Sequence, residues 1–135
     1  MLVFCDTSAL YAVASPKDEA HAKAAELWAR LISHERYRLV TINYVVVEAL
    51  SLAQRRRGLG AVRAMSEALE ESVDVTFVDV ALHREGLDEC LRGSRGPSLV
   101  DCVGFAFMRR HGIRTAFAFD KHFRQRGFQP PSLSS

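Results

Sequence analysis

Short apolar runs alternate along the chain with longer segments in which apolar residues recur every three or four positions. Four of the runs have the length and composition of buried β-strands, and one also alternates apolar and polar residues. The predicted strands cover residues 2–5, 39–42, 73–78 and 115–119. A helix-length segment separates each strand from the next, and this order favours parallel pairing.

The helical periodicity predicts five helices. Ser15 is a good N-cap and Pro16 suits a first helical position, so we expect the first helix to begin there, with Ala24 and Leu31 on its apolar face. The other helices are expected at about residues 45–57, 59–72, 80–91 and 98–111, with a glycine-containing loop at 93–97. This order predicts an α/β domain whose parallel sheet is covered by helices on both faces.

Length and composition limit the protein to one ordinary domain. The 135 residues, 48% of them hydrophobic and 25% charged, are typical of a globular protein and exclude a disordered or fibrous chain. We place the domain at residues 1–128 and expect the Pro- and Ser-rich tail, residues 129–135, to be flexible. The net charge of +2 does not by itself indicate a nucleic-acid binder.

Cysteine spacing and the first residues indicate the compartment. Cys5, Cys90 and Cys102 lie too far apart for a zinc motif or a disulfide framework, and we expect Cys5 and Cys102 to be buried thiols. The N-terminus lacks the pattern of a secretory signal, and no apolar run approaches the ~18 residues of a membrane span. We therefore expect a cytoplasmic protein that does not enter the membrane.

Four acidic residues stand out because of where they fall. Asp6 follows the first predicted strand and Asp120 the last, so both should lie at the carboxyl edge of the sheet, where α/β proteins bind ligands. Glu48 lies among valines in a helix, and Asp101 lies in the first turn of the helix that begins at Ser98. Such a group of acids would repel itself unless cations neutralised it. A site made only of oxygen ligands suits Mg²⁺ or Mn²⁺ better than zinc.

Each acid also has a purely structural explanation. Asp101 fits a capping box with Ser98, Asp120 could cap the short segment 121–124, and Asp6 could hydrogen-bond the turn that it opens. Glu48 could pair with a nearby arginine. Capping alone does not account for Glu48 in the middle of an apolar helix face.

Together these motifs resemble a known family. Asp6-Thr7-Ser8-Ala9-Leu10 after an apolar strand, Glu48, Ser98-Leu99-Val100-Asp101 and Phe119-Asp120-Lys121-His122-Phe123 occur in the order typical of PIN-domain proteins. The chain is most similar to the VapC ribonuclease toxins of bacterial toxin–antitoxin pairs, over almost its whole length. The resemblance implies a three-layer α/β/α sandwich, a divalent metal, endonucleolytic cleavage of RNA, a cognate antitoxin and a homodimer.

The resemblance also assigns residues by position. Asp6 and Asp101 match direct metal ligands, and Asp120 and Glu48 complete the family's acidic cluster, directly or through water. Thr7 and Ser98 match its small hydroxyl positions. The chain departs from the family at Ala118, where Thr or Ser is frequent, which places one hydrogen bond of the site in question.

Hydrolysis of a phosphodiester needs an activated water and stabilisation of charge on the phosphate oxygens, both of which one or two metal ions supply. Lys121 and Arg124, beside Asp120, are our candidates for substrate binding, and His122 is either a substrate contact or a packing residue. The arginines at 55–57 and 109–110 could instead stabilise the ends of their helices.

Two other functions are compatible with the sequence. A PIN-fold module could bind RNA or protein without cleavage, although the presence of all four acids argues against it. A different Mg²⁺-dependent phosphohydrolase could use Asp6 as a covalent nucleophile, but Ser8 stands where such enzymes commonly carry a second acid.

Overall fold

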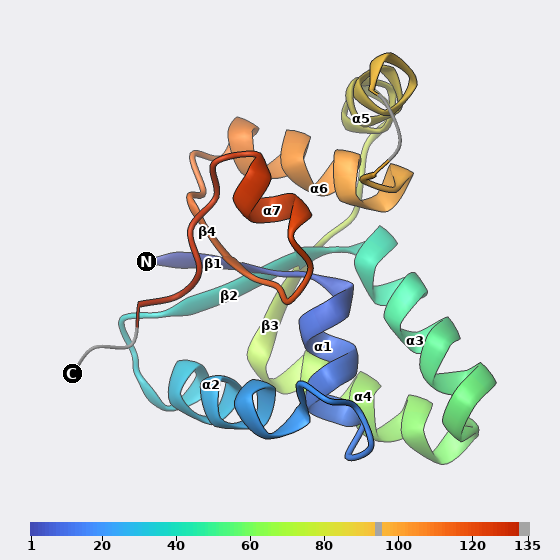
Figure 1. Cartoon of the computed structure of the whole chain (residues 1–135), viewed down its shortest axis with the longest axis vertical. Helices are drawn as coiled ribbons and strands as arrows, with labels where there is room; N and C mark the ends of the chain where they lie inside the picture. Colours follow the sequence, from blue (N-terminus) through green and yellow to red (C-terminus); the bar gives the residue numbers. More distant parts are fainter. Residues whose placement is uncertain (94–95, 133–135) are drawn as a thin grey trace.

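The computed structural model describes residues 1–93 and 96–132. Its centre is a four-stranded parallel sheet in the order β3-β2-β1-β4 (Figure 1). The elements in chain order are β1 (Leu2–Cys5), α1 (Thr7–Ala14), α2 (His21–Ser33), β2 (Arg38–Ile42), α3 (Asn43–Arg57), α4 (Leu59–Ser72), β3 (Val73–Thr76), α5 (Val80–Arg92), α6 (Leu99–Arg110), β4 (Thr115–Phe117) and α7 (His122–Gln125).

Helices pack on both faces of this sheet, as the sequence predicted. In Figure 1, α5, α6 and α7 lie on one side of the strands, and α1, α2 and α4 lie on the other. The α/β/α fold class expected from the sequence is therefore confirmed. Among the described residues, no helix is both long enough and apolar enough to span a bilayer.

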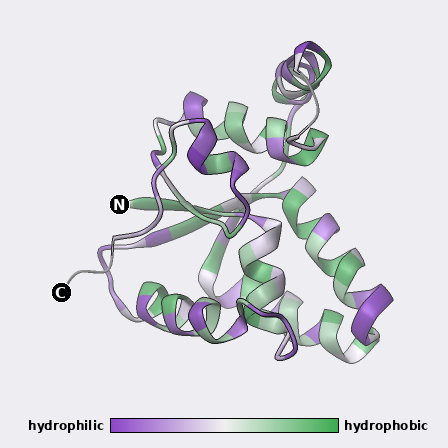
Figure 2. Ribbon diagram, viewed as in Figure 1, coloured by the Kyte–Doolittle hydropathy of each residue, from purple (hydrophilic) through white to green (hydrophobic). Residues whose placement is uncertain are grey.

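Strand β1 is the centre of the core. It pairs with β2 on one side and β4 on the other, and Val3, Phe4 and Cys5 are fully buried. The Phe4 ring lies 6.0 Å from that of Phe107 and 5.8 Å from that of Phe123, measured between centroids. Figure 2 shows β1 as continuously hydrophobic. A strand buried on both faces in this way brings its last residue to the sheet edge in a fixed position.

The buried thiols predicted from the sequence are confirmed. Cys5 and Cys102 are buried free cysteines, and Cys90 is partly exposed. Burial raises the pKa of the Cys5 thiol, with a smaller effect of the Asp6 charge in the same direction. Burial likewise raises the pKa of Cys102 to about 11. Both thiols are thus kept in their neutral, poorly nucleophilic form.

The first helix was predicted in the wrong place. Residues 7–14, to which we assigned no element, form α1, and the Asp6 side chain caps this helix by accepting a hydrogen bond from the Ser8 N–H. Ser15 ends α1, with its N–H bonded to the Ala12 carbonyl, and α2 starts only at His21. The strand prediction also ran two residues too far at the ends of β3 and of β4.

The two segments expected to be loop and tail are only partly described. Residues 94–95 of the predicted loop and 133–135 of the tail lie outside the described residues. Within the tail, Gln129 bridges Thr115 and exchanges backbone hydrogen bonds with Arg114 and Ala116. The Tyr37 hydroxyl donates to the Ser132 carbonyl at 3.1 Å.

Candidate metal centre

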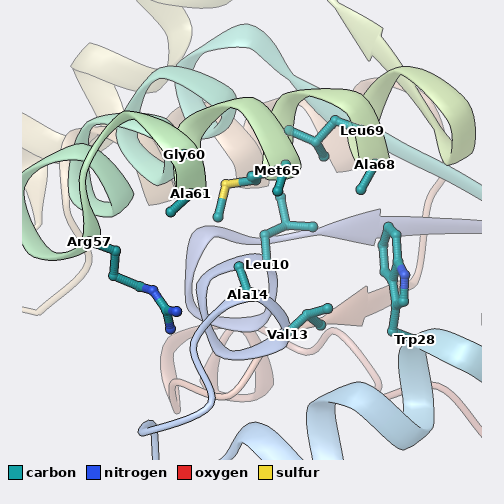
Figure 3. A pocket seen from close by; sticks show the side chains of 11 residues that line it. Leu10, Val13, Ala14, Trp28, Arg57, Gly60, Ala61, Met65, Ala68 and Leu69 are labelled. Atoms are coloured by element: carbon teal, nitrogen blue, oxygen red, sulfur yellow. The ribbon is translucent and has the colours of Figure 1, made fainter.

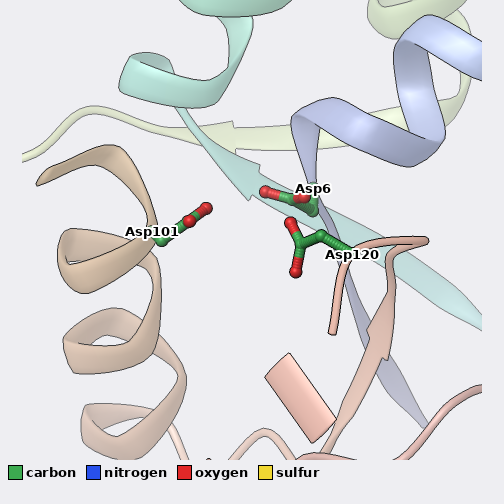
Figure 4. Close-up of side chains that lie close together, drawn as sticks. All are labelled: Asp6, Asp101 and Asp120. Atoms are coloured by element: carbon green, nitrogen blue, oxygen red, sulfur yellow. The ribbon is translucent and has the colours of Figure 1, made fainter. Parts of the chain in front are cut away.

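Three of the four predicted acids meet at the carboxyl edge of the sheet. Asp6 follows β1, Asp120 follows β4 by three residues, and Asp101 lies in the first turn of α6. One carboxylate oxygen from each can be chosen so that all three atoms lie within 4.8 Å of one another. Figure 4 shows the three side chains turned toward a common point from separate elements. We call Asp6, Asp101 and Asp120 the acidic cluster.

Each member of the acidic cluster is held by a nearby backbone group. Asp6 Oδ2 accepts from the Ser8 N–H (3.2 Å) and from the Ser8 hydroxyl (2.8 Å). Asp101 and Ser98 form the predicted capping box, with both hydrogen bonds at 3.1 Å. Asp120 Oδ1 accepts from the His122 N–H at 2.9 Å. The structural explanations of Asp6 and Asp101 are therefore correct, whereas Asp120 accepts a turn hydrogen bond and Lys121, not Asp120, is the N-cap of α7. These hydrogen bonds aim the three carboxylates at one another.

The electrostatics of the acidic cluster call for a cation. Burial of Asp6, which is 2% exposed, raises the pKa of its carboxyl, and the charges of Asp101 and Asp120 raise it further, against a lowering by the Ser8 hydrogen bond. Burial also raises the pKa of Asp101, against the lowering effect of its bond to the Ser98 N–H. Among the described residues, no Lys or Arg forms an ion pair with the cluster.

The donor set fits a divalent metal ion. Within the described chain, the buried Asp6 Oδ1 and the neighbouring Thr7 Oγ1 have no hydrogen-bond partner. Buried polar atoms are almost always paired, so an unpaired carboxylate oxygen among two other carboxylates marks a ligand position. All three donors are carboxylates, the hard ligands that Mg²⁺ and Mn²⁺ prefer. The helix N-termini of α1 and α6 further stabilise negative charge here.

Glu48 lies near the acidic cluster without being one of its three members. It is half-buried on α3, and its charge acts on Asp101, whose pKa it helps to raise. Helix α3 begins directly after β2, the strand next to β1, so that the sheet order brings Glu48 to the same edge. The sequence-predicted set of four acids is thus placed as three converging aspartates with a glutamate beside them.

Ser8 is a site residue that the sequence reasoning missed. Its hydroxyl donates to Asp6 and accepts from the Phe119 N–H at 2.9 Å, which joins the ends of β1 and β4. Ser8, in the first turn of α1, thus ties the Asp6 carboxylate to the segment that follows β4. An Asp followed two residues later by Ser at the start of a helix was the available signal, but it points equally to a simple cap.

The predicted substrate-binding cations differ in their surroundings. Lys121 and Arg124 are exposed, and neither forms an ion pair among the described residues. By contrast, Glu89 binds both Arg109 and Arg126. Arg110 pairs with Glu85 and Asp79, and the arginines at 55–57 occupy the last turn of α3. Arg109 and Arg110 are thus held by acidic residues, a structural role other than the expected one at the helix end, and Lys121 and Arg124 stay available for a ligand.

A separate cavity of about 420 Å³ lies between α1, α2 and α4 (Figure 3). Its walls are mostly apolar and include Leu10, Val13, Trp28, Met65 and Leu69. None of the four acids lines it. It offers no ligand for a metal and no group for acid–base chemistry, so within the described part of the chain the acidic cluster is the candidate centre.

A parallel α/β/α sandwich with a carboxylate cluster at the carboxyl edge of its sheet has the architecture and the ligands that metal-dependent hydrolysis of a phosphoester requires. A PIN-domain family model matches residues 3–129, and the chain belongs to the PIN-domain family. PIN nucleases depend on divalent metal, and the acidic cluster is where this chain would hold it.

Relatives of known activity carry the same architecture. The chain is 35% identical over 129 residues to the 23S rRNA-specific endonuclease VapC20 of Mycobacterium tuberculosis, from strains CDC 1551 / Oshkosh and H37Rv, covering 94% of this chain and 95% of the relative. The crystal structure of M. tuberculosis VapC20, described as a sarcin–ricin loop cleaving toxin, superposes with a TM-score of 0.84 at 34% identity. The superposition covers 93% of this chain and 95% of the VapC20 chain. The predicted family, fold and endoribonuclease class are thereby confirmed.

Proposed function

We propose that this protein is a divalent-metal-dependent endoribonuclease that acts as the toxin of a toxin–antitoxin pair. The observation that carries the proposal is the convergence of Asp6, Asp101 and Asp120, from three separate elements, on one point that lacks a compensating cation among the described residues. A chain that needed these aspartates only for their local hydrogen bonds would have no reason to bring the three carboxylates together against their mutual repulsion.

In this proposal Asp6, Asp101 and Asp120 hold Mg²⁺, for which Mn²⁺ can substitute, and Glu48 contributes through water. A divalent ion bound there lowers the pKa of a water and neutralises charge on the phosphate. Ser8 keeps the Asp6 carboxylate oriented, and Ser98 does the same for Asp101. Thr7, whose buried hydroxyl adjoins Asp6, supports the centre, and Lys121 and Arg124 hold substrate phosphates beside it.

The substrate we propose is the large-subunit ribosomal RNA, cut in its sarcin–ricin loop. Support comes from the names of the relatives, which are 23S rRNA-specific and sarcin–ricin loop cleaving, together with the near-complete coverage of both chains. A single exposed loop is a suitable target, because sequence-specific recognition of RNA usually uses unpaired bases that can be splayed out.

Partners and location complete the proposal. We propose that the protein works in the cytoplasm, that a cognate antitoxin holds it inactive, and that it forms a homodimer. Exposed large apolar side chains such as Phe77, Val80 and Leu91 support a contact with another chain, since such groups gain from burial. Light scattering of the purified chain, alone and with the product of the neighbouring gene, tests both associations. A monomer in the first sample contradicts the homodimer, and the absence of a complex in the second contradicts the antitoxin.

The substrate is tested by incubating intact ribosomal RNA with the protein and Mg²⁺ and sequencing the new ends. We expect one dominant cut within the sarcin–ricin loop, absent with EDTA and with Asp101→Asn. A metal-dependent cut elsewhere would replace the proposed target while leaving the activity in place. No cut by a folded, metal-loaded protein in naked RNA or in ribosomes would contradict the proposed function.

A further inference from the structure

A groove of about 330 Å³ opens beside the acidic cluster, and Asp120 is part of its wall. It lies between the first half of α2, the segment 116–120 that contains the end of β4, helix α7, and residues 128–131. Figure 1 shows the C-terminal segment running from α7 back along β4, where Gln129 bridges Thr115. Its size falls in the ~300–1,000 Å³ range of pockets that bind small ligands.

Two unpaired cations border this groove. Lys23 lines it from α2 and Arg124 from α7, and both side chains are exposed. Within the described residues neither forms an ion pair, in contrast to Arg126, which Glu89 binds. Cations that are free of acidic partners and lie beside a metal centre are suited to hold phosphate groups of a nucleic acid. Lys23 was not a candidate in the sequence analysis, because it lies almost a hundred residues before Asp120.

The rest of the groove is aromatic and apolar. Phe117 and Phe123 are buried in its floor, Phe119 is half-buried, and Pro130 and Pro131 lie on its wall. The Phe119 ring packs edge-on against that of Phe117, with 5.9 Å between centroids. The backbone N–H of Phe119 donates a hydrogen bond to the Ser8 hydroxyl, and the same hydroxyl donates to the Asp6 carboxylate. An aromatic ring fixed in this way relative to a metal ligand can position a stacked base or ribose next to the scissile bond.

We propose that this groove is the RNA subsite for the nucleotide that flanks the scissile phosphate, with Lys23 and Arg124 on its phosphates and Phe119 against its base or ribose. The inference rests on the proposed nuclease function and adds to it a direction: the RNA leaves the acidic cluster past Asp120 toward α2 and the C-terminal segment.

The test measures binding of an RNA hairpin that carries the sarcin–ricin loop, at several salt concentrations. All proteins carry Asp101→Asn so that the RNA stays intact. Into this background we introduce Lys23→Ala, Arg124→Ala or Phe119→Leu. Arg63→Ala, which removes an exposed cation of α4 outside the groove, is the matched control.

Log affinity falls linearly with log salt concentration, and loss of one phosphate contact makes this line less steep by ~0.7. At 0.1 M salt the same loss corresponds to a roughly fivefold lower affinity. We expect this loss for Lys23→Ala and for Arg124→Ala, no change for Arg63→Ala, and for Phe119→Leu a loss of affinity at unchanged slope. Equal losses in Lys23→Ala and Arg63→Ala would overturn the subsite, as would unchanged slopes in both groove variants.

Cleavage by the chain with Asp101 intact is measured in parallel and separates the two proposals. Metal-dependent cleavage together with unchanged binding by the groove variants overturns the subsite alone. Absence of cleavage by the intact chain overturns the nuclease function and the subsite with it.

Discussion

At the scale of single residues, the site consists of side chains that each perform two tasks. Asp6 caps α1, Asp101 completes a capping box and Asp120 accepts from the His122 N–H, yet the three carboxylates also face one another. The cap fixes the position of the carboxylate, and the convergence creates the repulsion that a metal ion relieves. A stabilising local role and a destabilising collective one thus coexist in the same residues.

Replacing Asp6 with Asn separates these two tasks. Asn keeps an oxygen for the Ser8 N–H and is itself a good N-cap, but it removes a buried charge. Because the folded-state pKa of Asp6 lies above its unfolded value of ~3.9, ionisation of Asp6 destabilises the fold increasingly as the pH rises above that value. In EDTA we expect Asp6→Asn to melt several degrees above the wild type at pH 7, with a smaller difference near pH 4.

The same thermal unfolding experiment includes Mg²⁺. The ion should raise the melting temperature of the wild type and not that of Asp6→Asn, since only the wild type retains the complete ligand set. A variant that melts below the wild type at pH 7 without metal, and that Mg²⁺ stabilises as much as it stabilises the wild type, would show that Asp6 serves stability and not metal binding.

Ser8 offers a second test at this scale. Ser8→Ala leaves the Phe119 N–H without its partner and removes the shorter of the two hydrogen bonds that Asp6 Oδ2 accepts, so it should cost about 1 kcal/mol of stability. The metal concentration for half-maximal cleavage should rise ~10-fold, as is typical when a partner of a metal ligand is lost. A metal titration of cleavage measures this, with Ser66→Ala on α4 as the control. An unchanged metal requirement would show that Ser8 has a structural role only.

At the scale of elements, the position of Asp101 depends on how closely α6 packs against α5. A Cβ added at Gly86 of α5 would lie 2.4 Å from Val103 Cγ2 and 2.7 Å from its Cα, both too short for contact. The two helices therefore approach through a glycine that no other residue can replace without separating them. Since α6 carries Asp101 in its first turn, this packing also sets the geometry of the acidic cluster.

Gly86→Ala should consequently destabilise the fold by about 1–3 kcal/mol, the usual cost of overpacking. Gly60→Ala is its matched control, because nothing lies within 4 Å of a Cβ there and α4 is exposed at this point. That variant should stabilise the protein by roughly 0.5–1 kcal/mol through helix propensity. Chemical denaturation measures both, and equal effects of the two substitutions would show that the α5–α6 contact is loose.

The sequence predicted these elements best where periodicity and length agree. The strand at 2–5 and the helix at 59–72 were placed correctly, because a short apolar run and a 14-residue amphipathic segment leave little choice. Helix α1 was missed, since its eight residues, Thr7–Ala14, are nearly all apolar and show no amphipathic period. The start of α1 depends on the hydrogen bond from the Ser8 N–H to the Asp6 side chain, and the same bond occurs in a simple turn.

At the scale of the whole molecule, the parallel sheet turns distant sequence positions into neighbours. Asp6 and Asp120 are separated by more than a hundred residues but follow adjacent strands, β1 and β4. Their proximity could be predicted, because any parallel sheet gathers its carboxyl ends at one edge. Lys23 and the groove beside Asp120 could not be predicted, because they depend on how α2 and the C-terminal segment pack together in three dimensions.

The central claim is that the acidic cluster binds a divalent metal and uses it to cut RNA. The most direct test titrates Mg²⁺ or Mn²⁺ into the protein and follows cleavage of the sarcin–ricin hairpin in the same samples. The variants are Asp101→Asn and, as a matched control, Asp74→Asn, an exposed aspartate of β3. We predict that wild type and Asp74→Asn bind metal and cleave with the same metal dependence, and that folded Asp101→Asn does neither. Metal-dependent cleavage by Asp101→Asn at the wild-type rate would contradict the account.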